Sequence, residues 1–230
     1  MINLSDIPDI KLTKQKGYRL INSKFPPISL FDDVASADEF ELLYELQALT
    51  NPRIQNEIGN INLIAKEDIP FHINGCSYAT APFTHVNPEG SRFSDGMYGV
   101  LYIGDSFDTA IAETRYHQNK IFNNIEGLHY DVVTMRGLTC YFSGCFADVT
   151  SYHKSIYHPN DYSDSQQLAK VLYKQKRQGL AYLSVRNPEA KCWALFTPKY
   201  VSEIKQTAHF EFIYDGNSIT RVETISKVRA

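Results

Sequence analysis

The sequence predicts an α+β protein, and three observations support this fold class. Residues 163–179, SDSQQLAKVLYKQKRQG, carry apolar side chains at helical spacing and end on a glycine. Several short apolar runs are rich in β-branched and aromatic residues, which favours strands. The run HFEFIYDGNSITRVETI near the end of the chain predicts a β-hairpin that turns at 215–217. We therefore expect many short strands and two or three substantial helices.

The first third of the chain has the least regular pattern. Residues 1–35 contain three prolines, and we expect them to form an irregular arm. Residues 36–49 predict a helix, because Ser36 and Glu39 make a capping box before leucines at helical spacing. The other elements expected before residue 90 are a helix over 52–58 and strands over 61–64 and 70–73.

The remaining elements are easier to place. A helix is expected over 109–122 with Asp108 as its N-cap, and the helix over 163–179 should end at Gly179. Gly137 favours a turn between two strands. The expected strands of this part are 99–104, 128–134, 138–143, 181–187 and 192–198.

The charge of the chain argues against nucleic acid as a partner. The 230 residues have a formal net charge of −3 and a pI near 6.2. Proteins that bind nucleic acid usually show a basic stripe, because contacts to phosphate supply much of their affinity. The densest basic run is 174–177, at the end of a predicted helix, where it complements the helix dipole.

Cysteine spacing and hydropathy exclude further classes. The four cysteines, at positions 76, 140, 145 and 192, lack the spacing of a zinc site. A chain of this length does not need a disulfide framework. No run approaches the 18 or so apolar residues of a membrane span. We therefore expect a cytoplasmic protein with free thiols, no metal and no membrane contact.

Two stretches carry side chains suited to chemistry. In 91–117, Arg92 offers a planar fork for phosphate or carboxylate. Tyr102 lies on the strand that follows and can form the wall of a slot for a flat ring, and Glu113 lies on the next helix. In 177–196, Ser184 is a hydroxyl within an apolar strand and needs a partner if it is buried. Arg186 shares its sheet face and is a second candidate for binding anions.

Composition and spacing alone leave these side chains open to ordinary structural roles. What points further is that RFSDGMYGVLYIGDSFDTAIAETRYH resembles the central motif of the RES domain. In that family an Arg-aromatic pair leads through a glycine-containing loop to a strand ending in Leu-Tyr or Tyr-Tyr, and then to a helix with a Thr-Ala-x-x-Glu pattern. The matching residues here are Arg92-Phe93, Gly96, Gly99, Leu101-Tyr102 and Thr109 to Glu113. The run QGLAYLSVRNPEAKCWALF is similar to the later part of the family, with Gly179, Tyr182, Ser184 and Arg186 in the expected order.

The resemblance extends over about residues 60–210 and implies an architecture. RES proteins have a fold similar to that of the ADP-ribosyltransferases, a split β core flanked by helices, with a cleft for NAD⁺. We therefore expect residues 61–230 to form the RES domain and residues 1–60 to form a partly helical N-terminal extension.

The resemblance also implies an activity. RES proteins are toxins of type II toxin–antitoxin pairs that release nicotinamide from NAD⁺, with phosphate or water attacking C1′ of the ribose. NAD⁺ is then a substrate, and no cofactor or metal is needed. Glu113 would stabilise the oxocarbenium charge, Arg92 would hold a phosphate, Tyr102 would bracket the nicotinamide and Ser184 would bind the ribose or the carboxamide. The implied partner is a helix-turn-helix antitoxin of the Xre type, in a complex that contains a toxin homodimer.

The sequence departs from the family at one position and leaves alternatives open. Many members carry an arginine after an aromatic residue early in the domain, whereas the stretch matched here has His72 after Phe71. His72 either contacts the substrate weakly or is structural. The same cleft would also serve a mono-ADP-ribosyltransferase that modifies a protein. A non-catalytic interaction module and a cysteine hydrolase that uses Cys76 or Cys192 are further alternatives.

Overall fold

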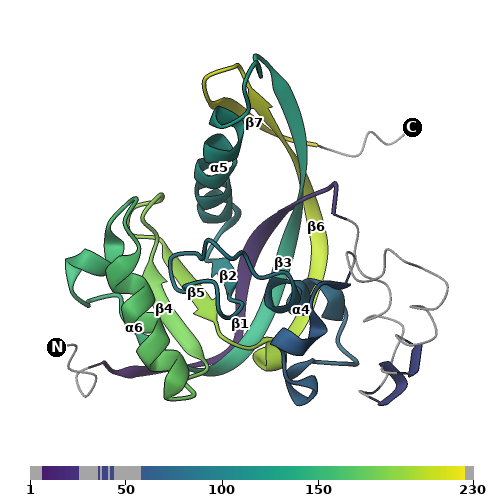
Figure 1. Ribbon diagram of the computed structural model, residues 1–230, viewed down its shortest axis with the longest axis vertical. Helices are drawn as coiled ribbons and strands as arrows, with labels where there is room; N and C mark the ends of the chain where they lie inside the picture. Colours follow the sequence, from purple (N-terminus) through teal and green to yellow (C-terminus); the bar gives the residue numbers. More distant parts are fainter. Residues whose placement is uncertain (1–6, 26–35, 37, 41, 44–57, 226–230) are drawn as a thin grey trace.

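A single seven-stranded sheet organises the protein (Figure 1). The computed structural model describes residues 7–25, 36, 38–40, 42, 43 and 58–225. The strands are β1 (Asp9–Asn22), β2 (Leu101–Gly104), β3 (Asp131–Asp148), β4 (Gly179–Leu183), β5 (Lys191–Leu195), β6 (Val201–Tyr214) and β7 (Ile219–Thr224). The helices are α4 (Cys76–Thr84), α5 (Phe107–Asn123) and α6 (Ser163–Lys174), with short 3-10 helices η2 (Ile61–Leu63), η3 (Lys66–Asp68), η4 (Lys154–Tyr157) and η5 (Pro198–Tyr200). The predicted α+β class is confirmed.

Five of the strands form a closed ring, and the other two extend the sheet beyond it. The order is β1-β2-β5-β4-β3-β6-β7, and β1 also pairs with β3. Consequently β1, β2, β5, β4 and β3 form a ring, and the upper ends of β3 and β6 run beyond it, where β6 pairs with β7 (Figure 1). Only β3 and β4 are parallel among these pairs. The β core is therefore divided between two regions, as the expected split core requires.

The ring closes through a single pair of residues. Tyr18 of β1 lies opposite Gly104 of β2, and this is the one register pair between the two strands. Gly17 permits the close approach, because a Cβ atom there would lie 2.4 Å from Cγ2 of Ile103. A side chain at position 17 would push β1 away from β2.

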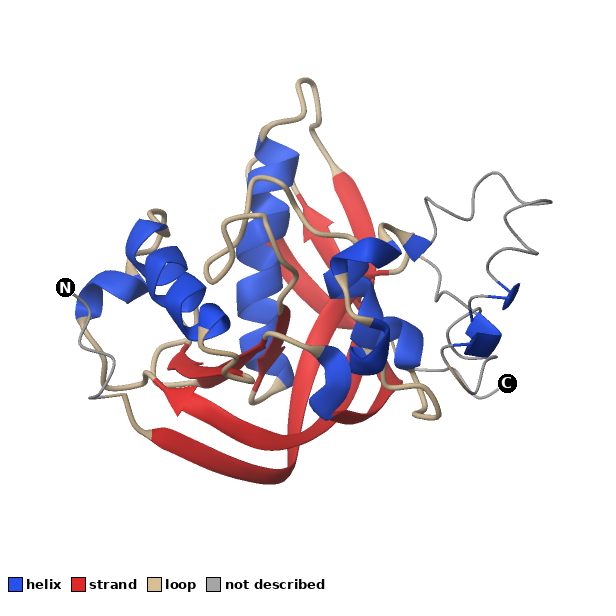
Figure 2. Ribbon diagram, turned by 60° about the horizontal axis from the view of Figure 1, so that its bottom comes forward, coloured by secondary structure: helices blue, strands red, loops and turns tan. Residues whose placement is uncertain are grey.

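The helices lie mainly to one side of the strongly curved sheet (Figure 2). Helix α5 covers the upper region, where Phe122 packs with Phe210, Phe212 and Tyr214. Helix α6 contributes Leu168, Ala169 and Leu172 to a second cluster over β4 and β5. A third cluster, which includes Phe142 and Trp193, joins strands of the ring to α4 and β6. In the described residues, no helix is both long enough and apolar enough to cross a membrane.

The irregular arm expected over 1–35 is wrong for residues 9–22, which form β1 and pair with β3 along most of their length. A bulge between Leu12 and Gln15, with Lys14 at φ 49°, shifts the alternation and hides the strand pattern. The division of the chain at residue 60 stays a prediction, although β1 shares a sheet with the rest of the protein.

The turn expected at Gly137 is also wrong. Residues 131–148 form one strand, and Gly137 lies inside it. A Cβ atom at this position would lie 2.8 Å from ring atoms of both Phe107 and Phe210. The glycine therefore makes room for two aromatic rings that join α5 to the sheet, and it does not reverse the chain.

Helix limits differ from the expected ones by a few residues. Helix α5 begins at Phe107, and its N-cap is Ser106, whose Oγ accepts from Thr109 N at 3.1 Å, instead of Asp108. Helix α6 ends at Lys174, and Gly179 begins β4 instead of capping the helix. The C-terminal hairpin is confirmed, with Asp215 N donating to Ser218 O across its turn.

The first third of the chain gives mixed outcomes. Residues 38–40 and 42–43 are helical, and Ser36 Oγ accepts from Glu39 N at 3.2 Å, as expected of a cap. The remainder of that helix and most of 52–58 lie outside the described residues. The expected strands over 61–64 and 70–73 are wrong, because the first is largely η2 and the second forms turns. Helix α4 was not predicted, since it contains Pro82.

Candidate active site

A cavity of about 270 Å³ lies where β1, β2 and α5 meet. In Figure 1 these three elements converge near the centre of the molecule. The strands β4 and β5 and the loop before β2 complete its wall. The residues that line it are Tyr18, Arg19, Leu20, Ser91, Arg92, Tyr102, Ile103, Gly104, Thr109, Ala110, Glu113, Thr114, His117, Tyr182 and Cys192. Three of the predicted site residues, Arg92, Tyr102 and Glu113, therefore share one cavity.

Glu113 and Ser184 are joined directly. Ser184 Oγ donates to Oε1 of Glu113 at 2.6 Å. The same Oγ accepts from the backbone N–H groups of Arg186 at 3.1 Å and Asn187 at 2.9 Å. Because both lone pairs are occupied, the single hydroxyl hydrogen of Ser184 is directed at the carboxylate. Ser184 is 6% exposed and follows the end of β4, so this contact fixes Glu113 from inside the protein.

Tyr102 forms a wall of the cavity with a hydroxyl that is already engaged. Its OH lies 2.7 Å from Ser91 Oγ and accepts from Phe93 N at 2.9 Å. Its ring stacks on that of Phe93, with centroids 6.5 Å apart. Burial raises the pKa of Tyr102 to about 12, although its two hydrogen bonds oppose the shift. Tyr102 is consequently a neutral phenol at physiological pH.

Arg92 is 8% exposed and holds a neighbouring segment. Its Nη1 donates to the carbonyl oxygens of Ile156 at 3.1 Å and His158 at 3.0 Å. Its guanidinium lies 4.5 Å from the ring centroid of Tyr162. One nitrogen of the fork is thus engaged in anchoring residues 156–162. An arginine has further N–H donors at Nη2 and Nε, which fits an anion contact from the cavity.

Arg19 is a site residue that sequence reasoning missed. It follows the aromatic Tyr18 on β1 and lines the cavity. Its Nη1 donates to Tyr102 O at 3.1 Å, and burial lowers the pKa of its guanidinium. Within the described residues, the ion pairs do not include Arg19, so its charge lacks a carboxylate partner. The resemblance to the family predicts an arginine after an aromatic residue at the position of His72. In the structure, Arg19, which follows Tyr18, lines the cavity and His72 does not.

The other three predicted residues, Ser184, His72 and Arg186, are not among those that line the cavity, and Ser184 is connected to it through Glu113. His72 is exposed on a turn with φ 73° and is not among the lining residues. Arg186 donates through Nη2 to Pro159 O and lies 3.3 Å from the ring centroid of Tyr116. Arg186 therefore joins the 156–162 segment to α5. His117, one turn beyond Glu113 on α5, is exposed and also lines the cavity.

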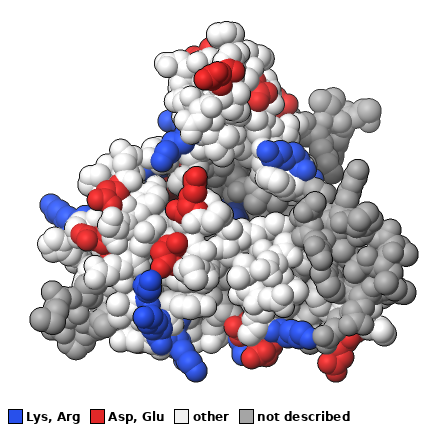
Figure 3. All heavy atoms as spheres, in the orientation of Figure 1, with Lys and Arg blue, Asp and Glu red and all other residues white. Residues whose placement is uncertain are grey.

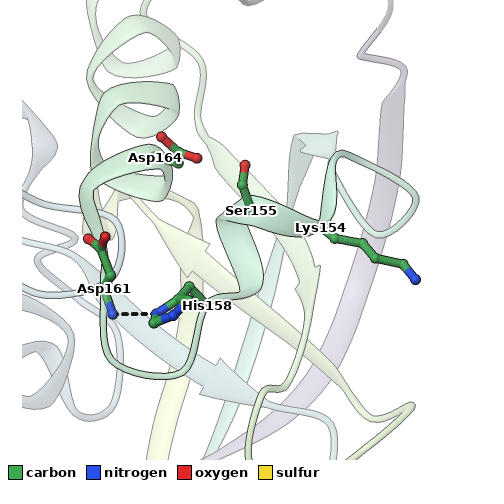
Figure 4. A pocket seen from close by; sticks show the side chains of 5 residues that line it. All are labelled: Lys154, Ser155, His158, Asp161 and Asp164. Carbon is green, nitrogen blue, oxygen red and sulfur yellow. Dashed lines mark hydrogen bonds between the residues drawn. The ribbon is translucent and has the colours of Figure 1, made fainter.

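A second hollow, of about 330 Å³, lies between η4 and the start of α6 (Figure 4). It is lined by Lys154, Ser155, His158, Asp161 and Asp164. Most of these side chains are exposed, and His158 Nδ1 is already used to accept from Asp161 N at 2.7 Å. The buried polar groups lie instead in the cavity around Glu113, which is why we place the site there.

Two surface properties bear on the choice of ligand. Among the described residues, no group of three His, Cys, Asp or Glu side chains is arranged to hold a metal ion. On the face shown in Figure 3, Lys and Arg side chains lie in separate small groups with Asp and Glu between them. A continuous basic surface of the kind that binds nucleic acid is not visible on the described part of this face.

The chain belongs to the RES-domain family. The sequence profile of the RES domain matches residues 69–215. The chain is also similar to "Uncharacterized protein y4oC" of Sinorhizobium fredii (strain NBRC 101917 / NGR234), with 29% identity over 208 residues that cover 90% of this chain and 86% of that protein. A comparison with solved structures finds "Crystal structure of the M.tuberculosis MbcT-MbcA toxin-antitoxin complex", with 10% identity, a TM-score of 0.36, and coverage of 60% of this chain and 73% of that one.

Proposed function

We propose that this RES-domain protein consumes NAD⁺ by breaking the bond between nicotinamide and ribose, and that it acts as the toxin of a toxin–antitoxin pair. The observation that supports the chemistry best is the Glu113 carboxylate in the cavity. One of its oxygens is fixed by Ser184 at 2.6 Å, while the cavity also contains two arginines.

The chemistry needs a fixed negative charge beside the ribose. Positive charge develops on the ribose ring as nicotinamide departs, and a preorganised carboxylate stabilises that charge. Ser184 holds Oε1 of Glu113, which leaves Oε2 for a ribose hydroxyl. Nicotinamide leaves as a neutral molecule, so a strong general acid is not required. Phosphate or water then attacks C1′, and an attacking water loses its proton to solvent or to the carboxylate.

The charges of the cavity suit an anionic dinucleotide. The lining of the cavity contains two guanidinium groups, those of Arg19 and Arg92, and one carboxylate, that of Glu113. A pyrophosphate would supply the negative partner that the half-buried Arg19 lacks among the described residues. Guanidinium groups also bind phosphate oxygens in a bidentate way. Inorganic phosphate could occupy the same donors if phosphorolysis is the reaction.

The size of the cavity suggests which end of NAD⁺ enters it. Sites for drug-sized ligands span about 300–1,000 Å³, so a cavity of about 270 Å³ takes a part of the dinucleotide. The reacting nicotinamide riboside would lie inside, against the neutral ring of Tyr102. The adenosine end would then extend past His117 into solvent.

The partner and the assembly belong to the same proposal. Membership in the RES family supports a helix-turn-helix antitoxin of the Xre type that blocks the cavity, and a toxin homodimer in the complex. Expression of the protein alone should stop growth and lower cellular NAD⁺. Co-expression with the product of a small neighbouring helix-turn-helix gene should restore both.

The decisive experiment is incubation of the purified protein with labelled NAD⁺, with and without phosphate, and mass spectrometry of the products. ADP-ribose would indicate water as acceptor, and ADP-ribose phosphate would indicate phosphorolysis. Label on protein would favour a mono-ADP-ribosyltransferase. Glu113→Gln should lower nicotinamide release about 10²- to 10³-fold, whereas Glu126→Gln, which changes an exposed glutamate beyond α5, should leave it unchanged. Absence of nicotinamide in every reaction would overturn the proposal.

A further inference from the structure

We propose that Asn187 is a positioning residue that sets the geometry of the Ser184–Glu113 pair through a hydrogen bond to Thr109. This inference rests on the proposed function of the same cavity. It concerns a residue that is not among those lining the cavity.

Asn187 lies in the loop between β4 and β5, and hydrogen bonds within this loop hold its two ends together. Ser184 N donates to Ala190 O at 2.8 Å, and Ala190 N donates to Asn187 O at 3.2 Å. Asn187 N also donates to Ser184 Oγ at 2.9 Å. Residues 184–190 therefore form a small unit in which a shift of Asn187 is passed to Ser184.

Two side-chain hydrogen bonds join this loop to α5. Asn187 Nδ2 donates to Thr109 Oγ1 at 2.9 Å, and Ser184 Oγ donates to Glu113 Oε1 at 2.6 Å. Thr109 and Glu113 are four residues apart on α5, so the two bonds lie about one helical turn apart on the same helix face. The first bond thus holds the loop in place beside the second.

The acceptor of Asn187 is itself fixed. Thr109 is fully buried, and its hydroxyl donates to Asp105 Oδ1 at 2.6 Å. Because its hydrogen is used there, Thr109 Oγ1 presents its oxygen to Asn187. The other oxygen of Asp105 accepts from Lys191 N at 2.8 Å, at the start of β5. Asp105 therefore ties the far end of the loop to the same turn of α5.

The expected consequence is a change in rate with little change in binding. Without its amide, residue 187 no longer fixes the loop, and Ser184 Oγ moves relative to Glu113. A displacement of about 1 Å at a catalytic group costs on the order of 100-fold in rate. Asn187→Ala should accordingly lower kcat for nicotinamide release about 10- to 100-fold and leave KM for NAD⁺ within about 2-fold. Thr109→Val should behave alike, and Thr109→Ser, which keeps the hydroxyl, should retain most of the rate.

A double-mutant cycle separates positioning from a general structural role. If Asn187 acts through Ser184, adding Asn187→Ala to Ser184→Ala should change kcat by less than about 2-fold. Equal losses in both backgrounds would overturn the inference. Glu189→Ala, an exposed change in the same loop, is the control that should leave the rate unaltered.

Crystal structures of the wild-type protein and Asn187→Ala provide a test that does not depend on activity. The Ser184 Oγ to Glu113 Oε1 distance should increase beyond 3.5 Å in the variant. An unchanged distance would refute the positioning role even if the wild-type protein does not cleave NAD⁺. Conversely, NAD⁺ cleavage by the wild type with an unaffected Asn187→Ala variant would refute this inference and leave the proposed function standing.

Discussion

Ser184 Oγ and Glu113 Oε1 lie 2.6 Å apart although the two residues are 71 positions apart in the chain. The carboxylate comes from α5 and the hydroxyl from the loop after β4. Backbone N–H groups occupy both lone pairs of the Ser184 hydroxyl, so its hydrogen is donated to the Glu113 carboxylate. The pair is thus set by the fold of the protein itself.

Glu113→Gln should remove the negative charge of this side chain and keep its size and its hydrogen bond. The amide oxygen of glutamine can still accept from Ser184, so we expect a free energy of unfolding within about 0.5 kcal/mol of the wild type. Loss of the negative charge should lower nicotinamide release about 10²- to 10³-fold. Steady-state kinetics and urea unfolding measure both quantities, and a rate close to that of the wild type would remove Glu113 from the mechanism.

Ser184→Ala should affect stability as well as rate. The change leaves the part-buried backbone N–H groups of Arg186 and Asn187 without their acceptor. An unsatisfied buried donor costs about 1–3 kcal/mol, so the free energy of unfolding should fall by about that amount. The matched control is Ser202→Ala, which removes an exposed hydroxyl bonded to Tyr141 O. A similar loss for both variants would contradict the role given to Ser184.

Arg92→Lys should loosen residues 156–162. A lysine ammonium does not reproduce a planar group that bonds two carbonyl oxygens and stacks on Tyr162. We expect a destabilisation of about 1.5–3 kcal/mol and faster proteolysis within this segment. Arg115→Lys, an exposed change on α5, serves as the control, and equal proteolysis rates in the two variants would argue against the anchoring role.

The phenol of Tyr102 should make the protein sensitive to alkali. Its pKa is raised from 10.0 to about 12 by burial, so the folded state holds this proton more tightly than the unfolded chain. The associated stability is complete below pH 10 and is lost as the pH rises from 10 towards 12. At pH 11 the loss amounts to about 1 kcal/mol.

Tyr102→Phe should therefore flatten the fall in the free energy of unfolding between pH 9 and 11. Tyr130→Phe removes a phenol that is 64% exposed and should leave that fall as steep as in the wild type. Denaturant unfolding at several pH values provides the measurement. If the free energy of unfolding has the same pH dependence in the wild type and both variants, the raised pKa of Tyr102 is not the cause of the sensitivity to alkali.

The sequence was a good guide to elements with a simple period. The hairpin at the end of the chain, α5 and the strand before it were predicted nearly in place, because each has clear spacing and a recognisable limit. β1 was missed because its bulge interrupts the alternation on which strand prediction depends. Gly137 was assigned to a turn, since a glycine needed for packing looks the same in a sequence as one needed for a turn.

The site shows the same limit. The central motif led to Arg92, Tyr102 and Glu113, which the fold brings together in one cavity. Arg19 is about 70 residues earlier, in a strand that was not recognised, so only the pairing of β1 could place it beside them. Asn187 carries no signal in the sequence, because its contacts depend on how the loop after β4 lies against α5.

The pairing of β1 has a consequence for synthesis of the protein. β1 is synthesised before the other strands, and its partner residues run from Met135 to Ala147 of β3. β1 can therefore pair with β3 only after more than a hundred further residues have left the ribosome. Pairings of such separation form slowly. Since β1 supplies Arg19 and β5 supplies Cys192, the lining of the cavity is incomplete until residue 192 has been translated.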